Sequence, residues 1–270
     1  MSKTILITGS TDGIGLATAK SLVELGHKVL VHGRSEAKLK DVLKQLSSVA
    51  AAEQLFAYQA DLSSFAELQK LVAEVKNDHQ QIDVLINNAG VFVINDKVTK
   101  DGLDTRFMVN TIAPYFLTTQ LLDIMPSDAR VVNLSSAAQA PLSAQELIQP
   151  SVQSDNAVYA KSKLALTMWS RSLALSLGQQ GPVIVAVNPK SFLGSKMVEQ
   201  AYGVAGTDLQ IGADILINAA LSKEFANATG KYYDNDINRF TAPHPDAEHA
   251  EKVATIEQTI IDIIRPYLAA

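Results

Sequence analysis

The sequence predicts an α/β fold in which helices cover both faces of one doubly wound parallel sheet, and three observations support it. Strand-like and helix-like segments alternate six times between residues 3 and 187. The strand-like segments are near-continuous apolar runs, the pattern of strands buried on both faces. No linker or shift in composition divides the 270 residues, so we expect a single domain over 1–270.

The elements follow one another in a regular order. The first helix should end at Gly26, since glycine favours the conformation that closes a helix. Pro114 should bend the long helical stretch 103–125. The expected strands are 3–8, 27–32, 55–59, 82–87, 130–134 and 183–187, and the expected helices are 14–25, 35–49, 64–77, 103–125 and 157–177. The pattern is weaker over 191–270, the expected substrate-side and C-terminal part, with helices near 209–222 and 247–264 and a last strand near 231–234.

Composition excludes several classes of protein. The net charge of −5 argues against a nucleic-acid binder, which needs concentrated positive charge. The absence of cysteine excludes disulfides and thiolate sites, and the five histidines show no metal-ligand spacing, so no metal is expected. No segment has the length and apolarity of a membrane anchor. We therefore expect a cytoplasmic protein.

A glycine-rich turn, Thr8-Gly-x-x-x-Gly-x-Gly15, lies between the first strand and the first helix. Glycines here permit a tight turn and a close approach of the backbone to a pyrophosphate, while the helix N-terminus attracts its charge. A lone glycine cluster is a weak signal, but this one has the strand–turn–helix context of a dinucleotide site. The fold class is thus a Rossmann-type one.

Tyr159 and Lys163 are four residues apart within the expected helix 157–177, so they lie one turn apart on the same face. A tyrosine normally has a pKa of about 10. A neighbouring ammonium favours the phenolate, and we therefore expect Lys163 to lower the pKa of Tyr159. Tyr and Lys pairs are also common on solvated helix faces, so the spacing alone does not define a site.

Four motifs together carry a resemblance. The glycine turn, Asn87-Asn88-Ala89-Gly90, the Ser135-Ser136 pair and Tyr159-x-x-x-Lys163 occur in the order and on the elements typical of the short-chain dehydrogenase/reductase family. The chain resembles that family from about residue 3 to residue 200.

The resemblance implies a catalytic set of Asn110, Ser136, Tyr159 and Lys163. Asn110 would hold a water in a proton relay, Ser136 would bind the substrate oxygen with Ser135 as its competitor, and Tyr159 would exchange the proton. Asp61 would touch the adenine, although it could instead be an ordinary loop carboxylate. The implied cofactor-binding residues are Gly9, Ser10, Thr11, Gly13, Ile14, Gly15, Arg34, Asp61, Leu62, Asn87, Ala89, Gly90, Tyr159, Lys163, Pro189 and Ser195.

Cofactor preference is predicted from the end of the second strand. Enzymes that prefer NAD place an acid there for the ribose 2′-hydroxyl, whereas an arginine accommodates a 2′-phosphate. This chain has Gly33 at the position of the acid and Arg34 after it, so we expect NADP(H) over NAD(H). Asp12 in the glycine turn weakens the case, since NADP-preferring relatives often have a basic residue there.

Two features depart from the usual family pattern. Lys190 replaces the glycine that commonly follows Pro189, and its side chain could either meet an anion or point to solvent. The 23 residues from Ser136 to Tyr159 form a longer gap than usual, so about 140–155 should rim the substrate pocket. This gap and Gly230-Lys231-Tyr232-Tyr233 resemble the retinol-dehydrogenase-like and WW-domain-oxidoreductase-like branch.

The resemblance implies an oxidoreductase that interconverts a carbonyl and an alcohol with NADP(H), acting on a small molecule. A reductase of an activated C=C bond and a non-catalytic dinucleotide-binding sensor are the alternatives. Family members form homodimers and homotetramers, and this branch also has monomers, so the oligomeric state stays open.

Overall fold

The computed structural model describes residues 2–268 and contains an eight-stranded sheet in the order β3-β2-β1-β4-β5-β6-β7-β8. All neighbouring pairs are parallel except β7 and β8. The strands are β1 (Thr4–Ile7), β2 (Lys28–Gly33), β3 (Leu55–Gln59), β4 (Val84–Asn87), β5 (Arg130–Leu134), β6 (Val183–Asn188), β7 (Tyr232–Asp234) and β8 (Arg239–Thr241). The predicted doubly wound parallel sheet is confirmed.

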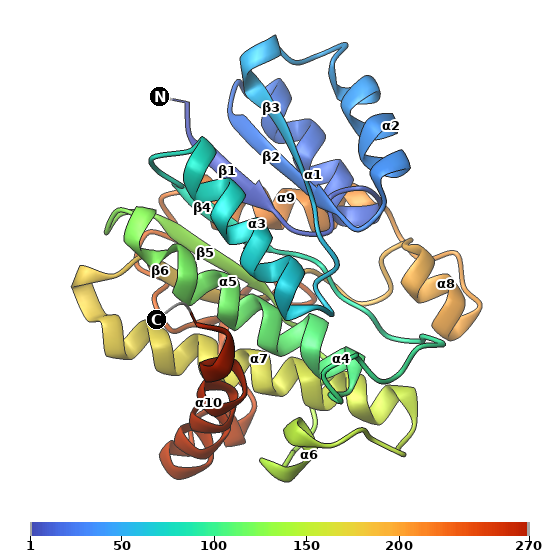
Figure 1. Ribbon diagram of the computed structural model, residues 1–270, viewed down its shortest axis with the longest axis vertical. Coiled ribbons are helices and arrows are strands. Elements are labelled where there is room, and N and C mark those ends of the chain that lie inside the picture. The colour runs from blue at the N-terminus through green and yellow to red at the C-terminus, as the bar shows by residue number, and fades with distance from the viewer. Residues whose placement is uncertain (1, 269–270) are drawn as a thin grey trace.

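Helices cover both faces of the sheet (Figure 1). They are α1 (Gly13–Glu24), α2 (Glu36–Leu46), α3 (Phe65–Asp78), α4 (Thr105–Phe107), α5 (Ala113–Leu121), α6 (Gln145–Ile148), α7 (Asp155–Leu177), α8 (Lys196–Tyr202), α9 (Leu209–Leu221) and α10 (Ala250–Ile264). In residues 2–268, none of these helices is long and apolar enough to cross a membrane.

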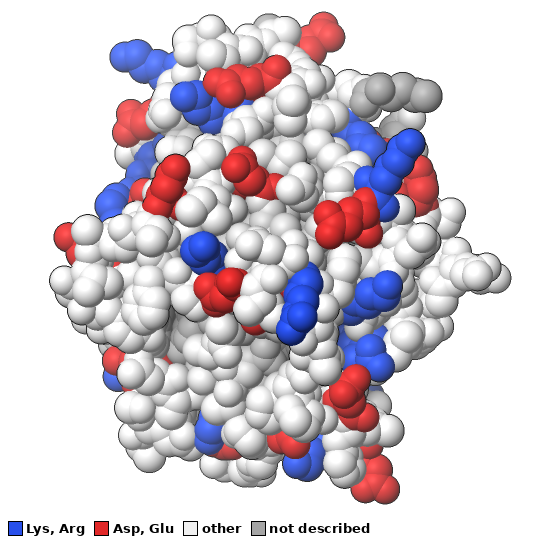
Figure 2. Space-filling view, turned by 180° about the vertical axis from the view of Figure 1, so that it is seen from behind, with Lys and Arg blue, Asp and Glu red and all other residues white. Residues whose placement is uncertain are grey.

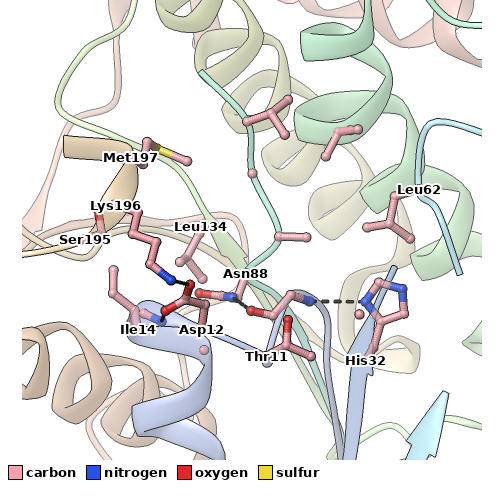
Figure 3. A pocket seen from close by; sticks show the side chains of 18 of the residues that line it. Thr11, Asp12, Ile14, His32, Leu62, Asn88, Leu134, Ser195, Lys196 and Met197 are labelled. Atoms are coloured by element: carbon pink, nitrogen blue, oxygen red, sulfur yellow. Dashed lines mark hydrogen bonds and ion pairs between the residues drawn. The ribbon is translucent and has the colours of Figure 1, made fainter. Parts of the chain in front are cut away.

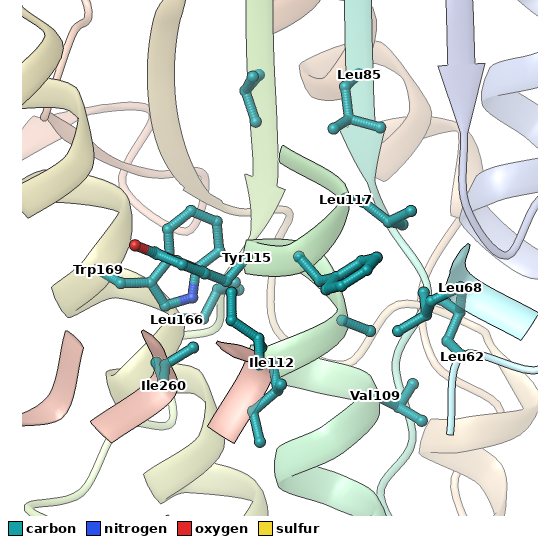
Figure 4. Packing of buried hydrophobic residues seen from close by; sticks show 14 of the residues in the cluster. Leu62, Leu68, Leu85, Val109, Ile112, Tyr115, Leu117, Leu166, Trp169 and Ile260 are labelled. Carbon is teal, nitrogen blue, oxygen red and sulfur yellow. The ribbon is translucent and has the colours of Figure 1, made fainter. Parts of the chain in front are cut away.

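Each inner strand sends alternate side chains to the two faces, because the side-chain period of a strand is two. Leu6 packs into the core beneath α3, α5, α7 and α10, whereas Ile5 and Ile7 pack into the core beneath α1, α2 and α9. Figure 4 shows the first core, where Tyr115 of α5 meets Trp169 of α7 edge to face at 5.2 Å between ring centroids. Apolar residues on both faces explain the near-continuous strand runs in the sequence.

The helix ends follow local chemistry. Gly26 has a φ of +84°, and its N–H donates to the carbonyl of Val23 while His27 N–H donates to that of Leu22. This is the expected glycine closure of α1. Ser154 caps α7 by accepting from the N–H of Ala157, so the helix begins two residues before the predicted start.

The stretch predicted as one helix, 103–125, is divided. It contains α4, a π turn over Met108–Ile112, α5 and a short 3₁₀ turn. Pro114 has no N–H for the carbonyl of Asn110, one turn earlier, which favours a wider turn at this point. Helices α6 and α8 were not predicted, because 140–155 and 191–210 show no regular apolar period. The three-residue strand β8 was not predicted either.

Candidate active site

A cavity of about 440 Å³ opens along the carboxyl ends of the strands, around the point where the order reverses between β1 and β4. Open α/β sheets bind ligands at such a switch point. Most of the predicted cofactor-binding residues line this cavity: Gly9, Thr11, Gly13, Ile14, Gly15, Arg34, Asp61, Leu62, Ala89, Gly90, Tyr159, Lys163, Pro189 and Ser195.

The glycine turn is shaped by close backbone packing. Gly9 has a φ of +64°, and a Cβ on it would lie 2.8 Å from the Cα of Ala89. A Cβ on Gly15 would lie 2.4 Å from the backbone oxygen of Gly9 and 2.4 Å from the side-chain Nδ2 of Asn88. These positions exclude side chains, so the turn leaves bare backbone and the first turn of α1 facing the cavity. Such a cradle fits a dinucleotide pyrophosphate.

A buried histidine, not predicted as a site residue, holds this turn in place (Figure 3). The Nδ1 of His32 accepts from the N–H of Gly9 at 3.1 Å, and its Nε2 lies 3.1 Å from the carbonyl oxygen of Ala60. Since one ring nitrogen accepts, the other carries the proton and donates to Ala60. Burial lowers the pKa of His32 to about 4, so the ring is neutral at physiological pH.

An exposed cation lies on the cavity wall directly after β2. Arg34 follows β2, lines the cavity and makes no ion pair with any residue that the structure describes. Asp61 also lines it, but its carboxylate accepts from the N–H and hydroxyl of Ser63 at 2.9 and 2.8 Å. The loop role considered for Asp61 from the sequence is therefore present in the structure.

Lys196 is a second cation on the cavity wall that sequence analysis missed. Its Nζ lies 2.5 Å from the carboxylate of Asp12, and Figure 3 shows this contact joining α8 to the glycine turn. Burial raises the pKa of Asp12, but hydrogen bonds from Lys196 and the N–H of Gly13 outweigh it and lower the pKa overall. The glycine turn has no basic residue of its own, and α8 places Lys196 beside it instead.

A second cavity, of about 220 Å³, adjoins the first, and Tyr159 and Ser135 line both. Ser136 lines the second cavity and lies close enough to the phenol of Tyr159 to influence its pKa. The hydroxyl of Ser135 is instead engaged with Thr167 Oγ1 at 2.7 Å. Of the two serines, Ser136 is thus the one placed beside Tyr159.

Lys163 lines the first cavity together with Tyr159, whereas Asn110 is buried and lines neither cavity. The Nζ of Lys163 lies 5.6 Å from the Tyr159 ring centroid. A Cβ on Gly90 would lie 3.5 Å from Asn110 Oδ1 and 3.6 Å from Lys163 Nζ, so both side chains converge on that glycine. Helix α7, the π turn and the loop after β4 together bring these groups to one place.

The side chain of Asn110 makes three hydrogen bonds within the protein. Its Oδ1 accepts from the N–H of Val91 at 2.8 Å, and its Nδ2 donates to the carbonyl of Val91 and to Ser162 Oγ, both at 2.9 Å. Pro114, four residues further on, has no N–H to offer the backbone carbonyl of Asn110.

The prediction that Lys163 lowers the pKa of Tyr159 is wrong for the protein without a cofactor. Burial raises the pKa of Tyr159 to about 12, and the nearby hydroxyl of Ser136 offsets this only in part. Lys163 is only 4% exposed, and burial lowers its own pKa to about 8. Loss of hydration is therefore the main cause of both pKa shifts.

Two predicted residues lie behind the cavity wall. The hydroxyl of Ser10 donates to the carbonyl of Ile7 and accepts from the N–H of His32. The amide of Asn87 is buried and donates to Asn133 Oδ1 at 2.8 Å. Both stabilise the strand ends, and Asn88 takes the place of Asn87 on the wall.

Three aromatic rings that sequence analysis did not single out line the second cavity. Phe92 lies 4.4 Å from Tyr159 between ring centroids, Tyr202 lies 5.8 Å from Phe92, and Phe192 lies 5.3 Å from Tyr202. Lys190 also lines this cavity, half-buried, with a φ of +123° that is unusual for a lysine. The segment 140–155, expected at the rim, contributes no residue to the lining of either cavity.

Within residues 2–268, no group of three or more His, Asp or Glu side chains is arranged to hold a metal ion. On the face shown in Figure 2, basic and acidic side chains are interspersed. Such a face offers no broad basic area of the kind that binds nucleic acid.

Comparisons with known proteins agree with this geometry. The family model for short chain dehydrogenases matches residues 3–203. Human polyprenol dehydrogenase is 34% identical over 189 residues, which cover 67% of this chain and 57% of that protein. Human retinol dehydrogenase 13 is 28% identical over 268 residues, covering 92% of this chain and 80% of its own length.

Solved structures share the fold. A protein from Mycobacterium paratuberculosis superposes with a TM-score of 0.80 at 22% identity, covering 97% of this chain and 93% of that one. The landomycin C-6 ketoreductase LanV, solved with NADP and rabelomycin, has a TM-score of 0.68 at 26% identity. The match covers 86% of this chain and 94% of LanV. With the family model spanning most of the chain, the protein belongs to the short-chain dehydrogenase/reductase family and is an oxidoreductase of its retinol-dehydrogenase-like branch.

Proposed function

We propose that this protein interconverts a carbonyl and an alcohol with NADP(H), using Tyr159, Lys163, Ser136 and Asn110. The observation that carries the proposal is the position of Tyr159 at the junction of the two cavities, with Ser136 on one side and Lys163 on the other. A dinucleotide in the first cavity would place its reactive end at that junction. A substrate in the second cavity would bring its oxygen to the phenol.

The chain's own groups supply the proton chemistry. The bound nicotinamide would supply or accept the hydride. With a pKa of about 12, Tyr159 is protonated at neutral pH and can donate its proton to the developing alkoxide. Ser136 would donate a second hydrogen bond to the same oxygen, which stabilises the negative charge that develops there. Lys163 would bind the ribose hydroxyls, and a water on the backbone of Asn110 would return a proton to the site.

Two cations support the preference for NADP(H). Arg34 lies at the wall without an ion-pair partner among the described residues, and a guanidinium can bind a phosphate in bidentate fashion. Lys196 adds charge beside the glycine turn. No carboxylate occupies position 33, where it would repel the 2′-phosphate. The ketoreductase LanV, a structural neighbour, was solved with NADP.

The aromatic side chains support a substrate with an apolar body. Phe92 is 4% exposed beside the phenol, whereas Phe192 and Tyr202 are 54% and 47% exposed at the mouth. A flat or extended apolar group can pack against these rings while its carbonyl reaches Tyr159.

Turnover assays test the proposal. A panel of aromatic and aliphatic aldehydes and ketones, including para-nitrobenzaldehyde, is offered with NADPH and NADH beside matched enones. We expect carbonyl reduction with NADPH, faster for aromatic members. Reduction confined to the C=C bond of the enones would contradict the assignment in favour of a C=C reductase. NADPH binding without turnover of any compound would favour a sensor.

One sheet runs from Thr4 to Thr241, and we propose that 1–270 form a single domain. The cytoplasmic location stays a prediction, and the oligomeric state stays open between monomer, homodimer and homotetramer.

A further inference from the structure

Ser136 begins an irregular segment. The N–H of Ser135 donates to the carbonyl of Val187 at 2.8 Å, the last link to the neighbouring strand. Residues 135–143 then run without helix or strand to α6. A catalytic hydroxyl on such a segment needs other contacts to hold it, because a loop does not fix its own side chains.

Two side chains hold the carbonyl of Ser136. The hydroxyl of Tyr232 donates to it at 3.0 Å, and the Nε2 of Gln139 donates to it at 2.9 Å. A carbonyl has two lone pairs, so both acceptor positions are used. Tyr232 lies in β7, 96 residues further along the chain, and belongs to the Gly230–Tyr233 motif that the proposed function does not use.

The hydroxyl of Ser136 has a separate contact within the loop. The Oγ of Ser136 accepts from the N–H of Ala138 at 3.1 Å, within the same turn. A hydroxyl has one hydrogen to donate, and this contact leaves it free. The hydrogen of the hydroxyl therefore stays available for donation to the phenol oxygen or to a substrate oxygen.

Tyr232 suits the task of a fixed donor. It is 5% exposed and pairs with Ala186 on one side and Thr241 on the other, so its backbone is held by two strands. Burial and the nearby carboxylates of Asp234 and Asp236 raise its pKa, which keeps the phenol protonated.

We propose that Tyr232, together with Gln139, is a positioning residue that holds Ser136 in its donor geometry. The inference rests on the role of Ser136 in the proposed function. Tyr232, and with it the Gly230–Tyr233 motif, would affect catalysis by positioning Ser136, without touching substrate or cofactor.

The chain offers a matched control in the next residue. Tyr233 is 6% exposed, packs against Phe225 and Phe240, and its hydroxyl makes no hydrogen bond with the described residues. Tyr232→Phe and Tyr233→Phe each remove one hydroxyl from a tyrosine of β7 whose ring is buried, but only the first breaks a contact to Ser136. Both variants keep their aromatic packing, so both should fold.

Kinetics with para-nitrobenzaldehyde and NADPH test the role. We expect Tyr232→Phe to lower kcat about tenfold, the value of one well-placed hydrogen bond, with the KM for NADPH unchanged. Tyr233→Phe should match wild type. In a Ser136→Ala background Tyr232→Phe should have no further effect, because it acts through the serine. Equal losses in both backgrounds would overturn the inference.

Hydrogen exchange gives a test that is independent of turnover. Tyr232→Phe should speed exchange of the amides in 135–140, Ala138 above all, whereas Tyr233→Phe should not. Unchanged exchange in Tyr232→Phe would also overturn the inference. If Ser136→Ala alone leaves turnover intact, the proposed role of Ser136 fails instead, and the exchange result still decides whether Tyr232 holds the loop.

Discussion

Lys163 donates a hydrogen bond from its Nζ to the backbone carbonyl of Leu134 at 2.6 Å, at the end of β5. The ammonium is therefore anchored to the sheet in the absence of a ribose. Its burial is unfavourable for the folded protein, since the charged form loses hydration. In the proposed function this unfavourable burial is offset when Lys163 binds the ribose hydroxyls of the cofactor.

Replacing this lysine should separate stability from activity. With a pKa of about 8 against an ordinary value of 10.5, the buried charge costs about 3 kcal/mol of folding free energy at neutral pH. In Lys163→Met, turnover should fall by about a thousandfold, but the free energy of urea unfolding at pH 7 should not decrease.

Burial of Lys163 should also make the stability of the protein depend on pH on the alkaline side. Between pH 8 and 10.5 the unfolded chain binds the proton that the folded chain releases, so wild-type stability from this group rises with pH in that window. Urea unfolding at pH 7 and pH 9.5 should show this rise in wild type and lose it in Lys163→Met. An identical slope in both would contradict the burial account.

Burial of His32 should make the stability of the protein depend on pH on the acidic side. Its folded pKa of about 4 lies below its ordinary 6.5, so protons bind the unfolded chain first as pH falls between those values. Stability from this group is present above 6.5 and is lost toward pH 4, by about 2 kcal/mol between pH 7 and 5. His32→Leu should flatten this loss and, by freeing the N–H of Gly9, weaken NADPH binding about tenfold. Unfolding at the two pH values and a fluorescence titration with NADPH provide the check.

Arg34 should decide between the two cofactors. Arg34→Leu is expected to raise the Kd of NADPH by about tenfold or more and to leave that of NADH nearly unchanged, because only NADPH carries the 2′-phosphate. Arg239→Leu, an exposed arginine on β8, serves as the control. Equal effects of Arg34→Leu on both cofactors would remove the basis for an NADP preference.

Lys196 should contribute to cofactor binding rather than to folding. The Lys196–Asp12 pair is 69% and 47% exposed, and exposed pairs add little stability. We expect Lys196→Ala to leave the melting temperature unchanged and to weaken NADPH binding about threefold at low salt, with the difference vanishing in high salt. Lys20→Ala on the outer side of α1 is the matched control. A salt-independent loss would indicate a structural role.

The parts that the sequence predicted share a physical basis. Apolar runs such as Ile5-Leu6-Ile7 specify strands because both faces are buried, and the glycine turn has an obligatory shape. The Tyr159 and Lys163 spacing needs only one helix to bring the groups together.

The parts that were missed depend on contacts between distant residues. Lys196 and Asp12 are 184 residues apart, and no local pattern pairs them. The aromatic cluster at Phe92 comes from three loop or short-helix segments without a common period. The pKa of Tyr159 was misjudged because spacing reveals a neighbouring charge but not the loss of water around both groups.

The central claim is that Tyr159 supplies the proton for carbonyl reduction, and one measurement tests it most directly. Steady-state reduction of para-nitrobenzaldehyde with NADPH is compared between wild type, Tyr159→Phe and the control Tyr202→Phe, which keeps its ring at the cavity mouth. We expect Tyr159→Phe to lose about a thousandfold or more in kcat while binding NADPH as wild type does, and Tyr202→Phe to stay near wild type. Turnover by Tyr159→Phe within about tenfold of wild type would contradict the mechanism.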